Sequence, residues 1–599
     1  MHTREFKNMT YKERLAAIRA AMQAQQIDAY IIPSSDPHIS EYLPDRYKCI
    51  AWASGFTGSA GTLVITADFA GLWTDARYFV QGAAQLAGSG FELVKLKAQG
   101  AAEYATWLSE RLPKGSKVAF DGQLASVALA QTVQQTLLPR GIAVDGQVDI
   151  LESVWQDRPD LPVAPAFLLD EAITGESTCS KLARVRAEMQ AKGATSHLVS
   201  SLDDLAWLLN IRGKDVPCNP VVLGFVLLDA EAAQLYIEPT KIRAADAEAL
   251  AQAGVTVKPY AEAFSAIAAL QADSILLDPK RTCFAVYDAV PDSTKIVEAM
   301  NPSTLMKAVK NAVEIAHTRE VMVKDGVAMT RFFKWIEEQL SSGHLSEISI
   351  ADKLQAIRAG GEGFRDISFD TIAGYREHGA LPHYKATPES NVALQAEGLL
   401  LVDSGGQYLD GTTDITRVVS LGQASDAEKK DYTLVLKAMI AGSTAVFPKG
   451  TRGYQIDALT RRPLWDEQRN YGHGTGHGVG FFLNVHEGPQ VFNPSNVDIP
   501  IAEGMISSIE PGLYREGEYG IRIENLVLSK NFSQNQFAEF MDFETLTICY
   551  IATDLVDKRY LDAADIAWLN NYNAWVFEKL SPYLEADEVA WLKEKTKAI

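Results

Sequence analysis

A glycine-rich segment, residues 471–489 with the sequence YGHGTGHGVGFFLNVHEGP, constrains the fold of this chain more than any other feature. It holds three of the ten histidines, His473, His477 and His486. Four carboxylates flank it along the chain: Asp403, Asp414, Glu510 and Glu524. Imidazole and carboxylate groups are common ligands of divalent metals. The pattern therefore predicts that distant segments meet around this one to form a hydrolase site with two metal ions.

The first two carboxylates are expected to converge across a hairpin. Residues 399–402 form a short apolar run of the kind that makes a buried strand, and residues 413–419 alternate in polarity. A Gly- and Asp-rich turn separates the two segments. Asp403 and Asp414 should then lie on facing strands of one hairpin.

The other two carboxylates follow the same logic. Residues 505–509 form a predicted strand that leads into Glu510, and residues 519–527 are predicted to form another. Side chains on a strand alternate between its two faces. Arg522 and Glu524 should therefore share one face, opposite the neighbouring isoleucines.

The charge of these side chains indicates the metals. Four crowded carboxylates would repel one another and raise some of their pKa values unless cations neutralised them. An oxygen-rich ligand set with one imidazole suits Mn²⁺, Co²⁺ or Zn²⁺. Carboxylates can bridge two such ions about 3.5–4 Å apart, and a water between the ions would supply hydroxide at neutral pH.

The segments that carry these residues resemble one known family. VDSGGQYLDGTTDITR, HGTGHGVGFFLNVHEGP, SIEPGLY and YGIRIEN are similar to the metal-binding segments of the proline-specific "pita-bread" metallopeptidases, and most of all to the long, three-domain cytosolic Xaa-Pro aminopeptidases. The resemblance implies two divalent ions per chain, Mn²⁺ ahead of Zn²⁺ or Co²⁺. It also implies the ligands: Asp403, Asp414, His477, Glu510 and Glu524. Metal-free relatives have lost some of these ligands, whereas all five are present here.

The resemblance further implies an activity. It predicts a metal-dependent aminopeptidase that hydrolyses the bond between any amino-terminal residue and a penultimate proline, with a bridging hydroxide as the nucleophile. Glu510 would carry a proton from the water to the leaving nitrogen in addition to binding metal. His383 is expected to be a catalytic residue that contacts the substrate and donates to the tetrahedral oxyanion.

Other residues are expected to contact the substrate. His473 and His486 match histidines that lie around the proline, and His486 is also a catalytic candidate. Arg522 is a further candidate, as is Arg77 in the segment WTDARYF, which matches an element that closes the groove. A glycine-flanked histidine can instead hold a loop, and Arg77 can instead form a salt bridge. His378 is expected to be structural.

The length of 599 residues predicts several domains, because a single hydrophobic core rarely grows so large. Residues 29–65 and 196–228 share one order of strand, helix, glycine-bearing loop and strand, which indicates an internal repeat. The fold class is a multidomain α/β and α+β protein with two related, creatinase-like domains before a pita-bread domain. The predicted domains are an α/β domain at 1–160, its repeat at 161–305, the catalytic domain at 306–540 and a helical extension at 541–599.

Two helices are expected at the start of the catalytic domain, over residues 303–322 and 325–340. The extension holds three tryptophans, Trp568, Trp575 and Trp591. A carboxy-terminal extension with so many aromatic residues either packs on its own domain or forms a subunit contact. The resemblance implies homodimers and favours the subunit contact.

Composition excludes several classes of partner. A net charge of −20 argues against binding to nucleic acid or anionic membranes, both of which need a basic surface. The five cysteines are scattered and odd in number, which is typical of a reducing compartment. The charged start of the chain lacks the apolar core of a signal peptide, and no apolar run long enough to span a membrane follows. The expected location is the cytoplasm, and the expected partners are peptides with proline second.

Three alternatives remain open at this point. Prolidase, which cleaves Xaa-Pro dipeptides, has the same five ligands but is usually shorter. Methionine aminopeptidase shares the fold but normally lacks the two large amino-terminal domains. A catalytically silent peptide- or histone-binding module on this fold would have degenerate ligands. The sequence does not identify the native metal, the physiological peptides or the role of the second domain.

Overall fold

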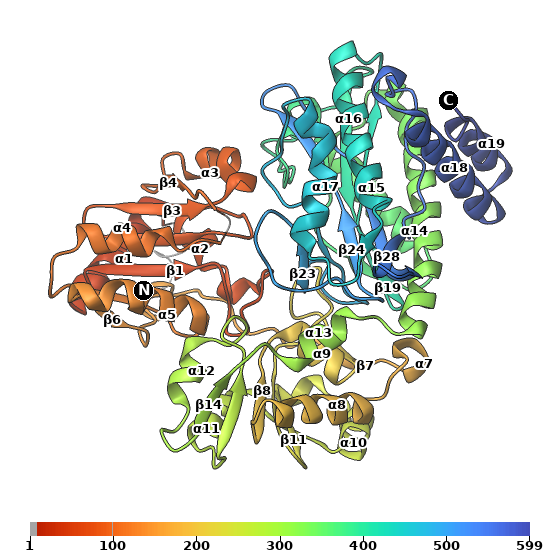
Figure 1. Ribbon diagram of the computed structural model, residues 1–599. Helices are drawn as coiled ribbons and strands as arrows, with labels where there is room; N and C mark the ends of the chain where they lie inside the picture. The colour runs from red at the N-terminus through yellow and green to blue at the C-terminus, as the bar shows by residue number, and fades with distance from the viewer. Residues whose placement is uncertain (1–8, 99) are drawn as a thin grey trace. The chain divides into compact units, whose positions relative to one another are not determined.

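The computed structural model describes residues 9–98 and 100–599. The chain forms two compact units (Figure 1). The first unit runs to Asp170 and also contains Glu176–Thr304. The second contains Glu171–Gly175 and Leu305–Ile599. The chain therefore passes between the units three times.

Two six-stranded sheets form the framework of the first unit. One sheet has the order β4-β3-β2-β1-β5-β6, and the other has the order β12-β11-β10-β8-β13-β14. The strands of the first are β1 (Ala29–Pro33), β2 (Thr62–Thr66), β3 (Ala70–Thr74), β4 (Glu92–Lys95), β5 (Lys117–Phe120) and β6 (Ala143–Asp145). Those of the second are β8 (Ser196–Val199), β10 (Phe225–Asp229), β11 (Ala233–Ile237), β12 (Val255–Pro259), β13 (Ser274–Leu277) and β14 (Lys295–Glu298).

The two sheets have the same topology. At each corresponding position, neighbouring strands are parallel in both sheets or antiparallel in both. A further short pair joins β7 (Phe167–Leu168) to β9 (Ile211–Arg212). The predicted internal repeat is confirmed as two related α/β domains.

Helices accompany both sheets because the central strands are buried on both faces. In β1, Tyr30 and Ile32 belong to one apolar core, and Ala29 and Ile31 belong to another. The helices of the first domain are α1 (Tyr11–Ala24), α2 (Cys49–Ser54), α3 (Phe79–Leu86), α4 (Glu103–Arg111), α5 (Val127–Leu137) and α6 (Leu151–Val154). Those of the second are α8 (Thr178–Ala191), α9 (Leu202–Leu208), α10 (Ala244–Gln252), α11 (Ala263–Ala268) and α12 (Phe284–Ala289).

The second unit is an α+β structure built on antiparallel strand pairs. Its sheets have the orders β21-β28-β27-β24-β22-β23, β16-β17-β20, β15-β18-β19 and β25-β26. The strands are β15 (Phe364–Ile367), β16 (Ile372–Tyr375), β17 (Leu399–Ser404), β18 (Gly406–Tyr408), β19 (Gly411–Thr412), β20 (Ile415–Ser420), β21 (Phe447–Pro448), β22 (Gly476–Gly478), β23 (Glu487–Phe492), β24 (Ile506–Ile509), β25 (Gly512–Arg515), β26 (Tyr519–Arg522), β27 (Asn525–Gln534) and β28 (Glu539–Thr545).

Helices pack against these strands in one large apolar core. They are α14 (Ala312–Gln339), α15 (Glu347–Ala359), α16 (Asp426–Ser443), α17 (Gly453–Asp466), α18 (Ala563–Leu580) and α19 (Ala586–Lys595). The short helix α7 (Glu171–Thr174) also belongs to this unit. The α+β class predicted for this part of the chain is confirmed.

The helices at the start of this region differ from the sequence prediction. The structure has a short α13 (Pro302–Ala308) followed by the long α14, so the expected break near residue 323 was wrong. Asn311 starts α14 with a capping box, in which its side chain accepts from the Glu314 N–H and Glu314 accepts in return. Gly326 lies inside α14, where a Cβ would sit 2.2 Å from the Ile548 carbonyl oxygen. That glycine permits close approach of the carboxy-terminal segment rather than ending the helix.

The three tryptophans of the tail pack against the core of their own unit. Trp568 stacks on Tyr572 with ring centroids 5.0 Å apart, and Trp591 meets Tyr550 edge-on at 5.5 Å. The first of the two expectations for this tail, packing on its own domain, accounts for these rings. Within the described part of the chain, no helix is both long and apolar enough to cross a bilayer.

Candidate metal centre

Asp403 lies on one of two neighbouring strands, as predicted, whereas Asp414 lies just before the other strand rather than on it. Strand β17 pairs with β20 in antiparallel fashion, and Asp403 lies opposite Thr416. Asp414 directly precedes β20. Both carboxylates are buried. The small hairpin of β18 and β19, which belongs to another sheet, is inserted between the two strands.

His477 and Glu510 come from two further paired strands. His477 lies on β22, which pairs with β24, and Glu510 directly follows β24. The His477 Nδ1 lies 2.8 Å from the Gly478 carbonyl oxygen, so this nitrogen donates and Nε2 faces the carboxylates. Nε2 lies 3.3 Å from Glu510 Oε1 and 3.5 Å from Asp414 Oδ2.

Glu524 lies where the chain passes from one sheet to another. Strand β26 ends at Arg522 and β27 begins at Asn525, so the single strand expected over residues 519–527 was wrong. Arg522 and Glu524 nevertheless both reach the carboxylate cluster, as the alternation predicts. The Glu524 Oε2 accepts a 2.7 Å hydrogen bond from Thr416 Oγ1.

The electrostatics of the cluster show an excess of negative charge. Burial raises the pKa of Asp403 to about 7, although Arg522 opposes the shift. Burial, with Asp414 and Glu510, raises the pKa of Glu524 well above its usual value.

One carboxylate of the cluster is neutralised by the histidine. Burial works against ionisation of Glu510, but the hydrogen bond and charge of His477 lower its pKa to about 2. Burial also opposes the charged form of His477, yet Asp414 and Glu510 hold the pKa of that imidazole well above its usual value. The side chains alone therefore neutralise only part of the charge.

The donor set fits divalent cations. One ligand atom from each of Asp414, His477 and Glu524 lies within 4.8 Å of the others. Asp403 Oδ1 and Glu524 Oε1 are buried and have no hydrogen-bond partner within the described chain. Buried polar atoms are normally satisfied, so such oxygens point to an absent partner. Four carboxylates and one imidazole are ligands for Mn²⁺, Co²⁺ or Zn²⁺.

Arg522 links the cluster to its surroundings. Its Nη2 donates to Asp403 Oδ2 at 2.6 Å and to the Pro382 carbonyl at 3.2 Å, and its Nη1 donates to the Tyr514 hydroxyl at 2.7 Å. The Tyr514 hydroxyl lies 2.7 Å from His473 Nε2. The other ring nitrogen of His473 lies 2.7 Å from the Gly474 carbonyl, so the protein uses both nitrogens. Burial lowers the pKa of His473 to about 4, which fits a neutral ring that accepts from Tyr514.

Two more predicted site residues lie beside this network. The ring of His486 packs edge-on against His477, with centroids 4.4 Å apart. His383 is partly exposed in the turn after the 3₁₀ segment η8 (Arg376–Ala380), directly following Pro382, whose carbonyl Arg522 holds.

Arg77 lies in the first unit and pairs with Asp75 through two 2.8 Å hydrogen bonds. This is the salt bridge that the sequence analysis weighed against a substrate contact. His378, expected to be structural, has its Nδ1 2.8 Å from the buried carboxylate of Glu347.

Several supporting residues were missed by the sequence analysis. Asp457 accepts from the Thr475 hydroxyl at 2.8 Å and pairs with Arg461, which donates to the His473 carbonyl at 2.6 Å. This pair fixes the glycine-rich loop from helix α17. The i, i+4 spacing on a helix was the only sequence signal for it.

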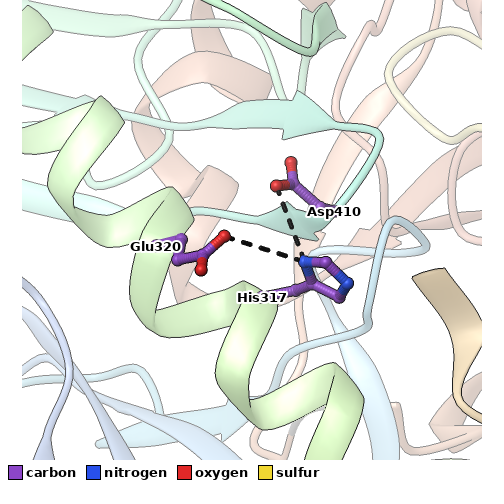
Figure 2. A group of neighbouring side chains, drawn as sticks. All are labelled: His317, Glu320 and Asp410. Atoms are coloured by element: carbon purple, nitrogen blue, oxygen red, sulfur yellow. Dashed lines mark ion pairs between the residues drawn. The ribbon is translucent and has the colours of Figure 1, made fainter. Parts of the chain in front are cut away.

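A second histidine–carboxylate group lies on α14 and the turn after β18 (Figure 2). The Nδ1 of His317 is 3.9 Å from both Glu320 and Asp410. Lys324 Nζ lies 3.1 Å from Asp410 and already supplies a positive charge. Glu320 is mostly exposed, with 68% of its side chain accessible. An ion-pair group accounts for this arrangement, and we assign it no metal.

Comparisons with known proteins extend over the whole chain. Residues 316–531 match the metallopeptidase family M24, and residues 539–599 match the C-terminal region of peptidase M24. Residues 14–153 and 157–314 each match a creatinase/prolidase N-terminal domain. A probable Xaa-Pro aminopeptidase P from Neurospora crassa is 38% identical over 98% of this chain and 88% of its own length. The chain belongs to metallopeptidase family M24.

Solved structures agree with this assignment. The X-prolyl aminopeptidase of Caenorhabditis elegans, described as a cytosolic enzyme with a di-nuclear active site, has a TM-score of 0.94 and 33% identity. The match covers 99% of this chain and all of that one. A dipeptidase from Mycobacterium ulcerans, with a TM-score of 0.51 and 25% identity, covers only 63% of this chain although 97% of its own length is matched. The family and the fold that the sequence motifs predict are thereby confirmed.

Proposed function

We propose that this chain is a metal-dependent aminopeptidase that releases the amino-terminal residue from peptides with proline in second position. The observation that carries the proposal is the convergence of Asp414, His477 and Glu524 beside two further acids, the buried Asp403 and the partly buried Glu510. Relatives named Xaa-Pro aminopeptidase P and the nematode structure, which match nearly the full length of the chain, support the substrate class.

The proposed metal ligands are the five residues Asp403, Asp414, His477, Glu510 and Glu524. Two divalent ions, when bound there, would lower the pKa of water and polarise the scissile carbonyl. We propose Mn²⁺ as the native metal, because carboxylate oxygens dominate the donor set.

The protein's own groups would move the protons. Glu510 accepts a 3.3 Å hydrogen bond from Ser508 Oγ, and its backbone N–H donates to the Thr475 carbonyl at 2.7 Å. This positioning suits a carboxylate that takes a proton from the attacking water and returns it to the leaving nitrogen. His383, held near Arg522 through Pro382, would donate to the oxygen of the tetrahedral intermediate.

The remaining histidines would shape the substrate site. We propose that His486, packed on His477, contacts the substrate near the scissile bond. With its nitrogens engaged, His473 would contact the substrate through its ring, and Arg522 would act mainly by orienting Asp403. Arg77 stays a proposed substrate contact on the family resemblance alone.

Proline selectivity has a physical basis. An Xaa-Pro bond has no N–H, and the pyrrolidine ring fixes the backbone φ angle. A general aminopeptidase groove that hydrogen-bonds this N–H would therefore fail, whereas a pocket shaped for a ring would succeed.

We also propose a cytoplasmic location and a homodimer. The nematode relative is described as cytosolic. The hairpin of β27 and β28 exposes Phe532 and Phe537, with 57% and 83% of each residue accessible, and exposed aromatic side chains are common at subunit contacts. Sedimentation of the purified protein at several concentrations tests the dimer.

The decisive experiment compares peptides after chelation and reconstitution with Mn²⁺, Co²⁺ or Zn²⁺. Arg-Pro-Pro should lose its first residue, whereas Leu-Ala-Ala should remain intact. Efficient hydrolysis of Gly-Pro without cleavage of Arg-Pro-Pro would instead identify a prolidase. Binding of proline peptides without hydrolysis of any of them would identify a silent module.

A further inference from the structure

Arg417 donates hydrogen bonds to the backbone of the proposed metal ligand Glu524 and to groups of the carboxy-terminal region. It is buried on β20, and its Nη1 donates to the Glu524 carbonyl at 2.6 Å. Glu524 lies between two strands, so its backbone groups depend on partners outside a regular ladder. Its N–H donates to the Thr416 carbonyl, and that carbonyl also accepts from Arg417 Nη1 at 3.0 Å. Arg417 and Thr416 therefore fix both the backbone and the carboxylate of Glu524.

The carboxy-terminal region supplies other hydrogen-bond acceptors of the Arg417 guanidinium. Arg417 Nε donates to the Tyr550 carbonyl at 3.0 Å, and Nη2 donates to the Cys549 carbonyl at 2.9 Å and to the Tyr572 hydroxyl at 3.0 Å. Nη2 also donates to Asn525 Oδ1 at 2.7 Å. All of these acceptors are neutral oxygens. The buried guanidinium of Arg417 is therefore oriented by the several hydrogen bonds that it donates to neutral oxygens, rather than by an ion pair with one carboxylate.

Tyr572 connects this arrangement to helix α18. Its hydroxyl lies 2.8 Å from the Thr547 carbonyl and 3.0 Å from the Cys549 carbonyl, so it can donate to either while accepting from Arg417. The ring stacks on Trp568 of the same helix. The Tyr550 ring packs against Trp591 of α19. Both carboxy-terminal helices therefore support the carbonyls and the hydroxyl that orient Arg417.

We propose that the carboxy-terminal helical region is a brace for the metal centre, by which we mean that it fixes the position of a proposed metal ligand. Tyr572 is a positioning residue that orients Arg417, and Arg417 in turn positions Glu524. The proposal rests on the proposed metal centre. It assigns the region a role within its own chain, independent of any subunit contact. Hydrogen-bond partners beyond the ligands typically change metal affinity ten- to a hundred-fold when they are lost.

The test is Tyr572→Phe in the full-length protein, with Tyr432→Phe as the matched control. The variant keeps the ring that stacks on Trp568 and removes only the hydroxyl. Tyr432 is also buried, and its hydroxyl donates to the Ala552 carbonyl at 2.8 Å in the same carboxy-terminal segment. Among the described residues, that hydroxyl forms no hydrogen bond with Arg417. Both variants should lower the unfolding temperature of the metal-free protein to a similar extent.

Metal affinity separates the two variants. Competition between the protein and a chelator for Mn²⁺ or Co²⁺ should show about tenfold weaker binding at one site in Tyr572→Phe and unchanged binding in Tyr432→Phe. The absorption spectrum of bound Co²⁺ should change only in Tyr572→Phe. Unchanged affinity in Tyr572→Phe, or equal loss in both variants, would overturn the brace. Absence of metal binding by the unmodified protein would instead refute the proposed function.

Discussion

Substituting Gly520 by alanine should disable turnover without touching a metal ligand. Gly520 lies on β26, two residues before Arg522, and faces the segment η8 that leads to His383. A Cβ at this position would lie 1.7 Å from the Gly379 carbonyl oxygen and 2.3 Å from the Gly379 carbonyl carbon. Both contacts are with backbone, so no side chain can rotate to relieve them.

The size of the effect follows from that distance. The contact has to open by about 1.3 Å before it reaches the 3.0 Å below which real Cβ contacts essentially do not occur. Strand β26 is paired with β25, whereas η8 continues into irregular chain, so we expect η8 to move. A misplacement of about 1 Å near a reacting centre can cost about 10²-fold in rate. Overpacking should also cost roughly 1–3 kcal/mol of stability.

The assay measures kcat on a Xaa-Pro-Xaa peptide alongside metal content and the unfolding temperature. Gly360→Ala is the matched control, because its Cβ would be 3.5 Å from the nearest atom and its φ is −76°. We expect Gly520→Ala to keep both metals and lose turnover, and Gly360→Ala to keep both metals and turnover. Normal kcat in Gly520→Ala would refute the reasoning. Loss of metal together with activity would show that β26, with Arg522, moves instead of η8.

Three further predictions concern single side chains. Glu524→Ala should lose at least one of two divalent ions and nearly all activity while remaining folded by circular dichroism. The two-metal site would be contradicted if elemental analysis finds no metal in the unmodified protein and reconstitution with metal does not increase its activity. His383→Ala should keep both metals and lose turnover by roughly 10²–10³, the usual range for one oxyanion donor, and loss of metal would mean that His383 is a ligand. The hydrogen bond to Glu347 raises the pKa of His378 against the opposing effect of burial, while Glu377 and the Tyr384 ring also face it. The stabilisation of the fold by the His378–Glu347 ion pair should therefore be complete below about pH 6.5 and lost as the pH rises through the raised pKa of His378. The substitution His378→Gln should then reduce the free energy of unfolding more at about pH 6 than at about pH 9. Equal reductions at the two pH values would refute the ion pair.

The site was predictable from sequence where local patterns determine it. The apolar run before Asp403 and the predicted strand before Glu510 place these carboxylates at strand ends, whatever the rest of the fold. The alternation of residues 519–527 correctly placed Arg522 and Glu524 together, although the chain changes sheets between them. The passage of the chain from one sheet to another depends on which other strands are available for pairing. The sequence of residues 519–527 alone carries no information about those strands.

Other features depend on contacts between distant segments. The residues that meet at Arg417 are as far apart in sequence as Thr416 and Tyr572, and no spacing rule connects them. The start of α14 was a different kind of miss. Asn311 and Glu314 carry the N-x-x-E signature of a capping box, so the sequence did contain the signal.

The segment Glu171–Gly175 matters for anyone who divides this protein into parts. Although it precedes most of the second α/β domain in sequence, it packs within the second unit. The Thr174 carbonyl accepts from the Asn311 side chain at 2.8 Å, and the Ala172 carbonyl lies 3.1 Å from His317 Nε2. In a fragment that starts at residue 305, the long helix α14 would therefore have lost two of its anchors. A catalytic fragment would need to include residues Glu171–Gly175 as well, so a single division of the sequence does not separate this unit from the first.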